Sequence, residues 1–449
     1  MTATVAVGLH DGFYGAGTGA GYANRGFVNT LAGLLAPGVR LVVLPIHLAE
    51  DSPEFQAGWH HDSAALCNAV GATVHPIDNG TAGWTRFGGV SAFEQTAKSA
   101  ASVLTELVLP AADPLFVVLF DVPFVGVPAL LPAGLLPHVS IVPRSTGLLH
   151  DPGNRARVGY ERQGLQHLGA RGGHVAAISA YMRAHLERGY GLSPDAIVDL
   201  SDGLTEDEWD FRPTRLPVLP PAAADGFVLA YGRAQPYKGW DDLIDAVALI
   251  RDRGVQMPHA LLAAVTDQPG TTDYQDQLSA RIDELALDAT LLTRFDPAIR
   301  GLLSHEALRA VVVPSRTEPF GRVPLEAYAA GAVPVVVTDA GGLPEQVIEG
   351  VTGFIAAAAD PASLAEALTR AVAVPDSGRR VMRRSGLALA HDRFDHGQAI
   401  AQFFGELAPW VCRAPHVEPP HGRRTTPDVA ASVSRQESRP WTAVRGHEG

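Results

Sequence analysis

The sequence has only two cysteines and only two lysines among its 449 residues. Cys67 and Cys412 are too few for a disulfide framework, so we expect two buried thiols and a reducing compartment, the cytoplasm. Basic residues are also scarce, because 48 Asp and Glu outnumber 35 Lys and Arg and the excess runs through both halves of the chain. Such a surface lacks the basic field that nucleic acid or an anionic membrane requires, which excludes both as partners.

Long hydrophobic runs are absent as well. The apolar start, Val5–Leu9, lacks the basic segment that precedes the apolar core of a signal peptide. Other runs, such as 115–120 and 333–337, are far shorter than the roughly 20 residues that span a bilayer. They have the length of buried parallel strands, so we expect no stable membrane insertion and parallel sheets inside the protein.

Length and the 46% hydrophobic content predict two domains of roughly 200 residues each, with a cleft between them. Apolar strands alternate with helical stretches in two series, which predicts the α/β class with two doubly wound, Rossmann-like domains. The expected strands are 5–9, 40–44, 115–120, 139–142 and 175–178, then 227–231, 260–264, 290–292, 310–313 and 333–338, with helices including 22–35, 240–251 and 363–374. The resulting assignment is a first, acceptor-side domain (1–212), a proline-rich linker (213–225), a second, donor-binding domain (226–395), a helix packing back on the first domain (396–412) and a disordered tail (413–449).

The segment 315–326 follows an expected strand and places Glu318 and Glu326 eight residues apart. Ligands bind at the carboxyl ends of the strands of open parallel sheets, and carboxylates there suit sugar and ribose hydroxyls. The amide of Gly321, beside Phe320, begins the next helix and can face a phosphate. The alternative is an ordinary solvated pair of glutamates.

Two further segments also follow strands. Arg233 and Lys238 bring two cations to one strand end, where a point charge beside a guanidinium suits a diphosphate. Arginine outnumbers lysine 33 to 2, so a lysine at this position indicates a need for its compact charge. Gly341 and Gly342, shortly before Glu345, permit close approach of a ligand to the backbone, although a Gly-Gly pair alone is more often a turn. The residues expected to bind the donor therefore include Phe320, Gly321, Gly341, Gly342 and Glu345.

Together these segments resemble the donor domain of retaining glycosyltransferases of family four, which have the GT-B fold. The resemblance covers residues 227 to about 411 through Gly-Arg-x4-Lys-Gly, Glu-x7-Glu and Gly-Gly-x-Pro-Glu. The first domain matches more loosely, and Asp202 stands where the family has asparagine. The resemblance implies that Arg233 and Lys238 hold the diphosphate of a nucleotide-sugar donor, expected to be a UDP-sugar. It also implies that Glu318 bonds the transferred sugar and Glu326 the ribose.

The same resemblance implies transfer with retention, no enzyme nucleophile, and neither metal nor cofactor. Consistently, no apolar strand ends in an Asp-x-Asp pair. In the glycine-rich turn 15–21, Gly19 and Gly21 are expected to contact the donor diphosphate from the first domain. Family members often place a histidine near the reacting carbon, but here histidine comes only at His150, with Asp11 and its neighbour His10 as further catalytic candidates; a satisfied loop histidine remains the alternative.

A nicotinamide oxidoreductase is the first rival, because Gly15, Gly17 and Ala20 fit a relaxed dinucleotide pattern. The second strand ends without an acidic residue for a ribose, which argues against it. A nucleotide-sugar epimerase and a non-catalytic binding partner of another transferase stay open.

The acceptor is expected to be a small molecule. Four carboxylates at or after strand ends suggest a cationic one such as an aminocyclitol; they are Asp11, Glu50, Asp51 and Glu54. The Ala-, Gly-, Arg- and Pro-rich composition suggests a GC-rich bacterial genome and antibiotic or other natural-product biosynthesis. The sequence names neither the acceptor nor the oligomeric state.

Overall fold

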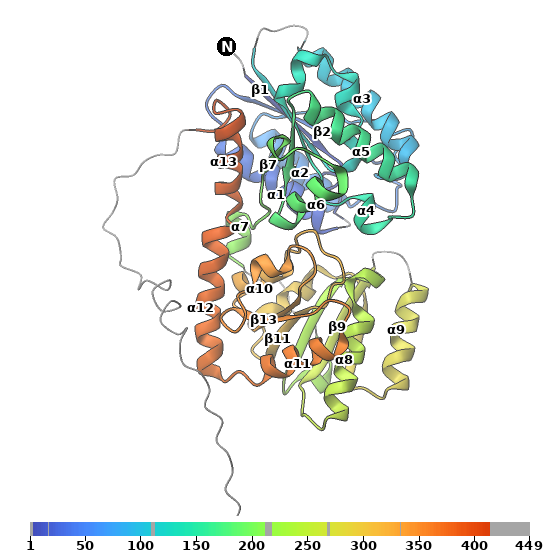
Figure 1. Ribbon diagram of the computed structural model, residues 1–449, viewed down its shortest axis with the longest axis vertical. Helices are drawn as coiled ribbons and strands as arrows, with labels where there is room; N and C mark the ends of the chain where they lie inside the picture. The colour runs from blue at the N-terminus through green and yellow to red at the C-terminus, as the bar shows by residue number, and fades with distance from the viewer. Residues whose placement is uncertain are drawn as a thin grey trace, which may run out of the picture. The chain divides into compact units, whose positions relative to one another are not determined.

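The computed structural model describes residues 3–16, 18–108, 113–211, 218–266, 270–332 and 334–413. They form two parallel sheets, one in residues 3–211, which we call the first lobe, and one in residues 218–395, the second lobe (Figure 1). The strand orders are β3-β2-β1-β4-β5-β6-β7 and β10-β9-β8-β11-β12-β13. In each order the chain first winds to one side of the sheet and then to the other, so the predicted doubly wound α/β class is confirmed.

The first lobe has the strands β1 (Thr4–Leu9), β2 (Arg40–Pro45), β3 (Thr73–Val74), β4 (Leu115–Phe120), β5 (Val139–Val142), β6 (His174–Ala177) and β7 (Ile197–Asp199). Its helices are α1 (Gly19–Leu34), α2 (Ala57–Ala69), α3 (Val90–Val108), α4 (Gly147–His150), α5 (Arg155–Ala170), α6 (Ala180–Tyr190) and α7 (Glu206–Trp209). Three 3-10 helices connect β4 to β5: η1 (Val122–Phe124), η2 (Val127–Leu130) and η3 (Ala133–His138).

The second lobe has the strands β8 (Phe227–Arg233), β9 (His259–Thr266), β10 (Ala289–Arg294), β11 (Leu308–Val313), β12 (Val335–Thr338) and β13 (Gly353–Ala356). Its helices are α8 (Trp240–Asp252), α9 (Asp273–Glu284), α10 (Val323–Ala330), α11 (Pro361–Val372) and α12 (Asp376–Arg393), with the 3-10 helices η5 (Pro221–Ala223), η6 (Pro236–Lys238), η7 (Pro297–Ser304) and η8 (Leu343–Gln346).

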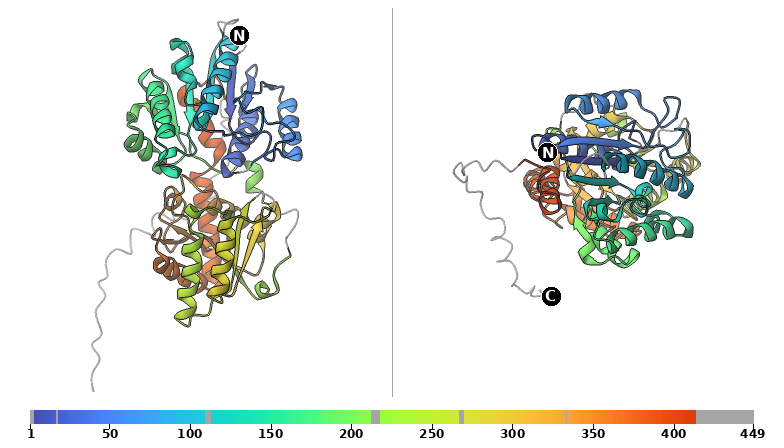
Figure 2. Two further views of the ribbon diagram at one scale, coloured as in Figure 1. Left: turned by 90° about the vertical axis from the view of Figure 1, so that its right-hand side faces the viewer. Right: turned by 90° about the horizontal axis from the view of Figure 1, so that it is seen from above.

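Both faces of the first sheet are buried. Val5 and Val7 of β1 belong to one cluster of buried side chains, whereas Ala6 between them belongs to another. Successive strand residues point to opposite faces, so each face has its own cover, which the helices on the two sides provide (Figure 2). This burial explains why β1 and β4 are continuous apolar runs and could be located from the sequence.

The last two described helices belong to different lobes (Figure 1). Helix α12 packs on α10, where a Cβ atom at Gly386 would overlap the ring of Tyr328. Helix α13 (His396–Leu407) packs on α1, and Phe403 and Phe404 lie 6.1 and 5.8 Å from the ring of Phe116. The expected C-terminal helix that crosses back to the first domain is thus confirmed, although it ends at Leu407 and not at residue 412.

Two predictions concern segments that the structure describes only in part. Of the predicted linker, residues 213–217 lie outside the described residues, and the remainder contains the 3-10 helix η5, which buries Ala223. The predicted disordered tail lies outside the described residues from 414 onward. Its first residue, Arg413, is held: its N–H and Nε donate to the carbonyl oxygens of Leu34 and Leu35, both at 2.8 Å.

Candidate functional site

The central part of the candidate site lies where the winding of the second sheet reverses, between β8 and β11. These neighbours are parallel, so the chain leaves both at the same sheet edge. Lys238 ends η6 after β8, and Glu318 lies in the loop after β11. The Lys238 ammonium forms an ion pair with the Glu318 carboxylate. The two residues were predicted from separate motifs, and the structure brings them into direct contact.

Arg233, the other predicted cation, lies beside this pair. Its Nη2 donates to the Tyr237 hydroxyl at 2.6 Å, and the Lys238 ammonium lies 5.8 Å from the Tyr237 ring centre. Arg233 is exposed, whereas Lys238 is partly buried. Among the described residues, only Lys238 of these two cations pairs with a carboxylate, an arrangement suited to an anionic ligand.

The predicted donor-binding glycines surround Glu318. Gly321 and Gly341 have φ angles of 81° and 61°, which favour glycine. A Cβ at Gly321 would lie 2.8 Å from the Glu318 Cγ, and one at Gly341 would overlap the Glu318 carbonyl. That carbonyl also accepts from the Gly342 N–H at 3.0 Å. These glycines are thus already required by the packing of the Glu318 loop, and contact with a donor stays a prediction.

Glu326 is buried in the first turn of α10, and cationic and hydroxyl groups surround its carboxylate. The Tyr231 hydroxyl donates to Oε2 at 2.6 Å, and Arg300 Nε lies 3.4 Å from the same oxygen. Arg322 Nε lies 3.6 Å from Oε1. Sequence reasoning assigned no role to these three neighbours. Arg322 lies inside the Glu-x7-Glu motif and could have been noticed, whereas Arg300 has no signal in the sequence.

His150, predicted as catalytic, comes from the first lobe and reaches the second. Its ring lies 4.7 Å from that of Tyr237. Burial, helped by the charges of Lys238 and Arg233 and opposed by Glu318, lowers the pKa of His150 to about 4. Its Nδ1 is buried and has no hydrogen-bond partner among the described residues. The structure therefore places a neutral imidazole beside the Glu318–Lys238 pair.

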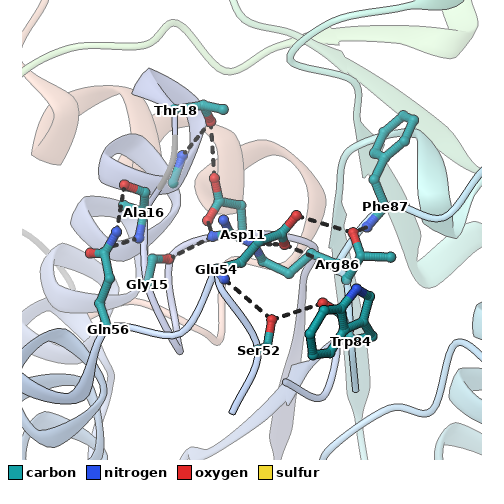
Figure 3. Close-up of polar contacts among 12 residues, drawn as sticks. Asp11, Gly15, Ala16, Thr18, Ser52, Glu54, Gln56, Trp84, Arg86 and Phe87 are labelled. Carbon is teal, nitrogen blue, oxygen red and sulfur yellow. Dashed lines mark hydrogen bonds and ion pairs between the residues drawn. The ribbon is translucent and has the colours of Figure 1, made fainter. Parts of the chain in front are cut away.

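Asp11, the other catalytic candidate, is engaged inside the first lobe (Figure 3). Its buried carboxylate forms an ion pair with Arg86 and accepts from Thr18 Oγ1 at 3.0 Å. Arg86 also donates to the Gly15 carbonyl at 3.1 Å and to Glu54 Oε2 at 2.9 Å. These contacts give Asp11 a structural role, which is to hold the glycine-rich turn, and its catalytic role stays a prediction.

The two glycines predicted to contact the donor from this turn differ. Helix α1 begins at Gly19, earlier than expected, because the Thr18 side chain caps it and accepts from the Gly21 N–H at 3.3 Å. A Cβ at Gly21 would lie 2.7 Å from the Asp11 carboxylate, whereas one at Gly19 would meet nothing within 4 Å. Gly21 is therefore required by packing, and Gly19 is the one with open space beside it.

Two predicted donor-binding residues have other roles in the structure. Glu345 caps α6 of the first lobe, because its carboxylate accepts from the N–H groups of Ala180 and Tyr181 at 3.0 and 2.8 Å. The Phe320 side chain is buried against Phe394, with ring centres 5.8 Å apart. The prediction had not considered that a glutamate after a glycine pair can cap a helix of the other lobe.

The described residues contain neither a metal-binding cluster nor a membrane-spanning helix. No three His, Cys, Asp or Glu side chains come together there as a metal site requires. No described helix combines the length and the apolar character needed to cross a membrane.

The fold and these contacts define the class. Sucrose-phosphate synthase from Thermosynechococcus elongatus superposes with a TM-score of 0.66 at 20% identity, covering 90% of this chain and 98% of that one. HepE from Anabaena, solved in complex with UDP and glucose, gives 0.62 at 18%, covering 90% and 99%. The protein thus has the GT-B fold of two-lobed glycosyltransferases.

The family follows from the sequence of the second lobe. Residues 215–386 match the family described as glycosyl transferases group 1. The resemblance of the second lobe to family four is confirmed by this match. The D-inositol 3-phosphate glycosyltransferase of Frankia alni is 37% identical over 211 residues, which are 45% of this chain and 50% of that protein. The chain therefore spans about half the length of the curated relatives it matches.

Proposed function

We propose that the protein is a retaining, metal-independent glycosyltransferase that moves a sugar from a UDP-sugar onto a small hydroxylated acceptor. The observation that carries this proposal is the Glu318–Lys238 pair with Arg233 beside it and the neutral His150 reaching it from the other lobe. UDP is the expected nucleotide because HepE, of the same fold, binds it. The scarcity of cysteine supports a cytoplasmic reaction.

In this proposal the donor diphosphate lies against Lys238 and Arg233, which neutralise its charge. The bond between the anomeric carbon and the diphosphate oxygen breaks, and a bond to the acceptor oxygen forms on the same face. The acceptor hydroxyl gives its proton to the leaving phosphate oxygen. Glu318 then serves as a hydrogen-bond acceptor for the sugar hydroxyls and stabilises the positive charge that develops at the anomeric carbon.

His150 has a different part in the same proposal. At neutral pH its imidazole is uncharged, because its pKa is lowered to about 4. It adds no positive charge to the site, but it can donate one hydrogen bond and accept another. The unpartnered Nδ1 makes it a suitable partner for a hydroxyl of the transferred sugar.

The acceptor that we propose differs from the one that the sequence suggested. Asp11 and Glu54 share Arg86, so two of the four carboxylates invoked for a cationic acceptor already have a cationic partner. A curated relative acts on D-inositol 3-phosphate, according to its name. We therefore favour a polyol or sugar phosphate as acceptor, and an aminocyclitol in natural-product biosynthesis becomes the second choice.

The test is a transfer assay. The purified protein is incubated in EDTA with UDP-, GDP-, dTDP- or ADP-sugars and with inositol phosphate, hexose phosphates or an aminocyclitol, while nucleoside diphosphate release and products are followed by NMR. The proposal expects acceptor-dependent UDP release and a product with the anomeric configuration of the donor. A changed sugar configuration without any acceptor would indicate the epimerase, inversion would exclude the retaining mechanism, and no reaction with any pair would favour the binding partner.

A further inference from the structure

Arg322 is a buried arginine inside the Glu-x7-Glu segment, and its guanidinium points in two directions. Nη2 forms an ion pair with the Glu208 carboxylate, and Nη1 donates to the Gly203 carbonyl oxygen at 3.0 Å. On the other side, Nε lies 3.6 Å from Glu326 Oε1 and has no hydrogen-bond partner among the described residues. One side chain thus contacts both the chain that leaves the first lobe and the carboxylate predicted to bind the ribose.

The chain on the far side of Arg322 lies at the connections between the lobes. The Leu204 N–H donates to the Phe394 carbonyl, and the His396 N–H donates to the Leu204 carbonyl, both at 3.3 Å. The segment 203–208 therefore pairs with the junction of α12 and α13, the second connection between the lobes. Glu208 is fixed there because its Oε2 accepts from the Thr205 N–H at 2.9 Å. A movement at either connection would therefore shift the groups that hold the Arg322 guanidinium.

The orientation of the Glu326 carboxylate can change when Arg322 moves. One oxygen, Oε2, is held by the Tyr231 hydroxyl at 2.6 Å and lies near Arg300. The other, Oε1, faces Arg322 at a distance too long for a hydrogen bond. Oε1 is thus oriented by the charge of Arg322 without being saturated by it, which leaves it able to accept from a hydroxyl.

We propose that Arg322 is a positioning residue that orients Glu326 for the donor ribose and makes that orientation depend on segment 203–208. This inference rests on the proposed function, because it takes Glu326 as the ribose ligand. The charges support it: Arg300 and Arg322 balance Glu208 and Glu326, so each change of Arg322 is felt by both carboxylates. Donor affinity then follows the arrangement of the two connections.

The experiment compares two nucleotides that differ at the ribose alone. UDP and 2′,3′-dideoxy-UDP are titrated by calorimetry into the unchanged protein, Arg322→Lys and Glu208→Gln. Lysine keeps the charge but cannot reach Glu208, Gly203 and Glu326 together, so Arg322→Lys should weaken UDP binding about tenfold. The dideoxy nucleotide has no hydroxyl for Glu326, so its affinity should change less than about twofold.

Glu208→Gln provides an independent test if Arg322→Lys folds poorly. Glu208→Gln releases Arg322 toward Glu326, where it competes with the ribose, so UDP binding should fall while binding of the dideoxy form stays. Arg316→Lys is the matched control, because Arg316 lies nearby in the segment 315–326 but pairs with Asp242 of its own lobe at 2.6 and 2.7 Å. It should leave both affinities unchanged.

The outcomes distinguish the positioning role of Arg322 from the proposed function. Equal weakening of both nucleotides by Arg322→Lys and Glu208→Gln would show general damage to the lobe and overturn the positioning role. Unchanged UDP binding in both variants would overturn it as well. If the unchanged protein binds neither nucleotide, the proposed function itself fails, and the inference fails with it.

Discussion

In both lobes the chain places a carboxylate and a cation where the sheet winding reverses, but the two pairs differ in what surrounds them. Asp11 and Arg86 are buried, and the pair is completed by Thr18, Gly15 and Glu54 (Figure 3). Glu318 and Lys238 are only partly buried. Beside them stand the exposed Arg233 and a histidine nitrogen without a described partner.

This difference separates a structural pair from one available to a ligand. A buried ion pair whose partners are all internal cannot exchange them without leaving a charge unpaired. A partly exposed pair beside an unmatched cation can accept an anion and share its charges with it. The first lobe therefore supplies a fixed turn, and the second supplies the groups that we propose for donor binding.

The largest effect on the free energy of unfolding is expected when the cation of the buried pair is removed. Arg86→Met leaves the carboxylates of Asp11 and Glu54 without their partner, so the free energy of unfolding should fall by about 3–5 kcal/mol. Urea denaturation followed by circular dichroism measures the loss. Lys238→Met is the matched control and should cost less than about 1 kcal/mol; equal losses in the two variants would abolish the distinction.

Turnover, unlike stability, should depend on the partly buried pair of the second lobe. Glu318→Gln keeps the shape of the side chain but removes the charge that stabilises the developing positive charge at the anomeric carbon, so turnover should fall by roughly 10²-fold or more. Initial rates at saturating donor and acceptor measure this, with the melting temperature as the control for folding. Unchanged turnover would remove Glu318 from the site.

Donor binding should depend on Lys238. Lys238→Ala removes one charge-assisted contact of the diphosphate and should raise the dissociation constant of UDP by roughly tenfold. Titration calorimetry measures it, and Lys98→Ala serves as the control because the only other lysine lies on α3, away from these motifs. Equal affinities of Lys238→Ala and the unchanged protein would contradict the assignment.

The smallest effect concerns pH and the junction of the lobes. Burial lowers the pKa of His396 to about 4, whereas an unfolded histidine titrates near 6.5. Between these values the unfolded chain binds a proton that the folded one does not, so stability is lost as pH falls through this window. His396→Leu should reduce the drop in melting temperature between pH 7 and pH 5 by roughly 2 °C. An unchanged drop would show that His396 does not stay neutral in the folded protein.

The sequence predicted the fold well because both sheets are buried on two faces. Strands such as β4 are continuous apolar runs, so their bounds could be read directly. The start of α1 was placed too late, since Gly19 and Gly21 were interpreted as turn residues although Thr18 had the signature of an N-cap.

The site was predicted in part. Glu318, Lys238 and Arg233 stand out through their spacing after strands, and the structure places them together. Arg86 and Arg300 could not be found this way, because their partners lie far away in the sequence and an isolated arginine carries no motif. The helix-capping contact of Glu345 was not predicted, because a carboxylate near glycines can bind a ligand or cap a helix, and local sequence does not distinguish the two.

The most direct test of the central claim is thermal stabilisation of the purified protein by UDP, GDP, dTDP, ADP and NAD. A ligand at 100 times its dissociation constant adds about 2.7 kcal/mol to the stability of the folded state. The account predicts a higher melting temperature with UDP that disappears in Lys238→Ala and remains in Lys98→Ala. Stabilisation by NAD alone, or a UDP effect that survives in Lys238→Ala, would contradict it.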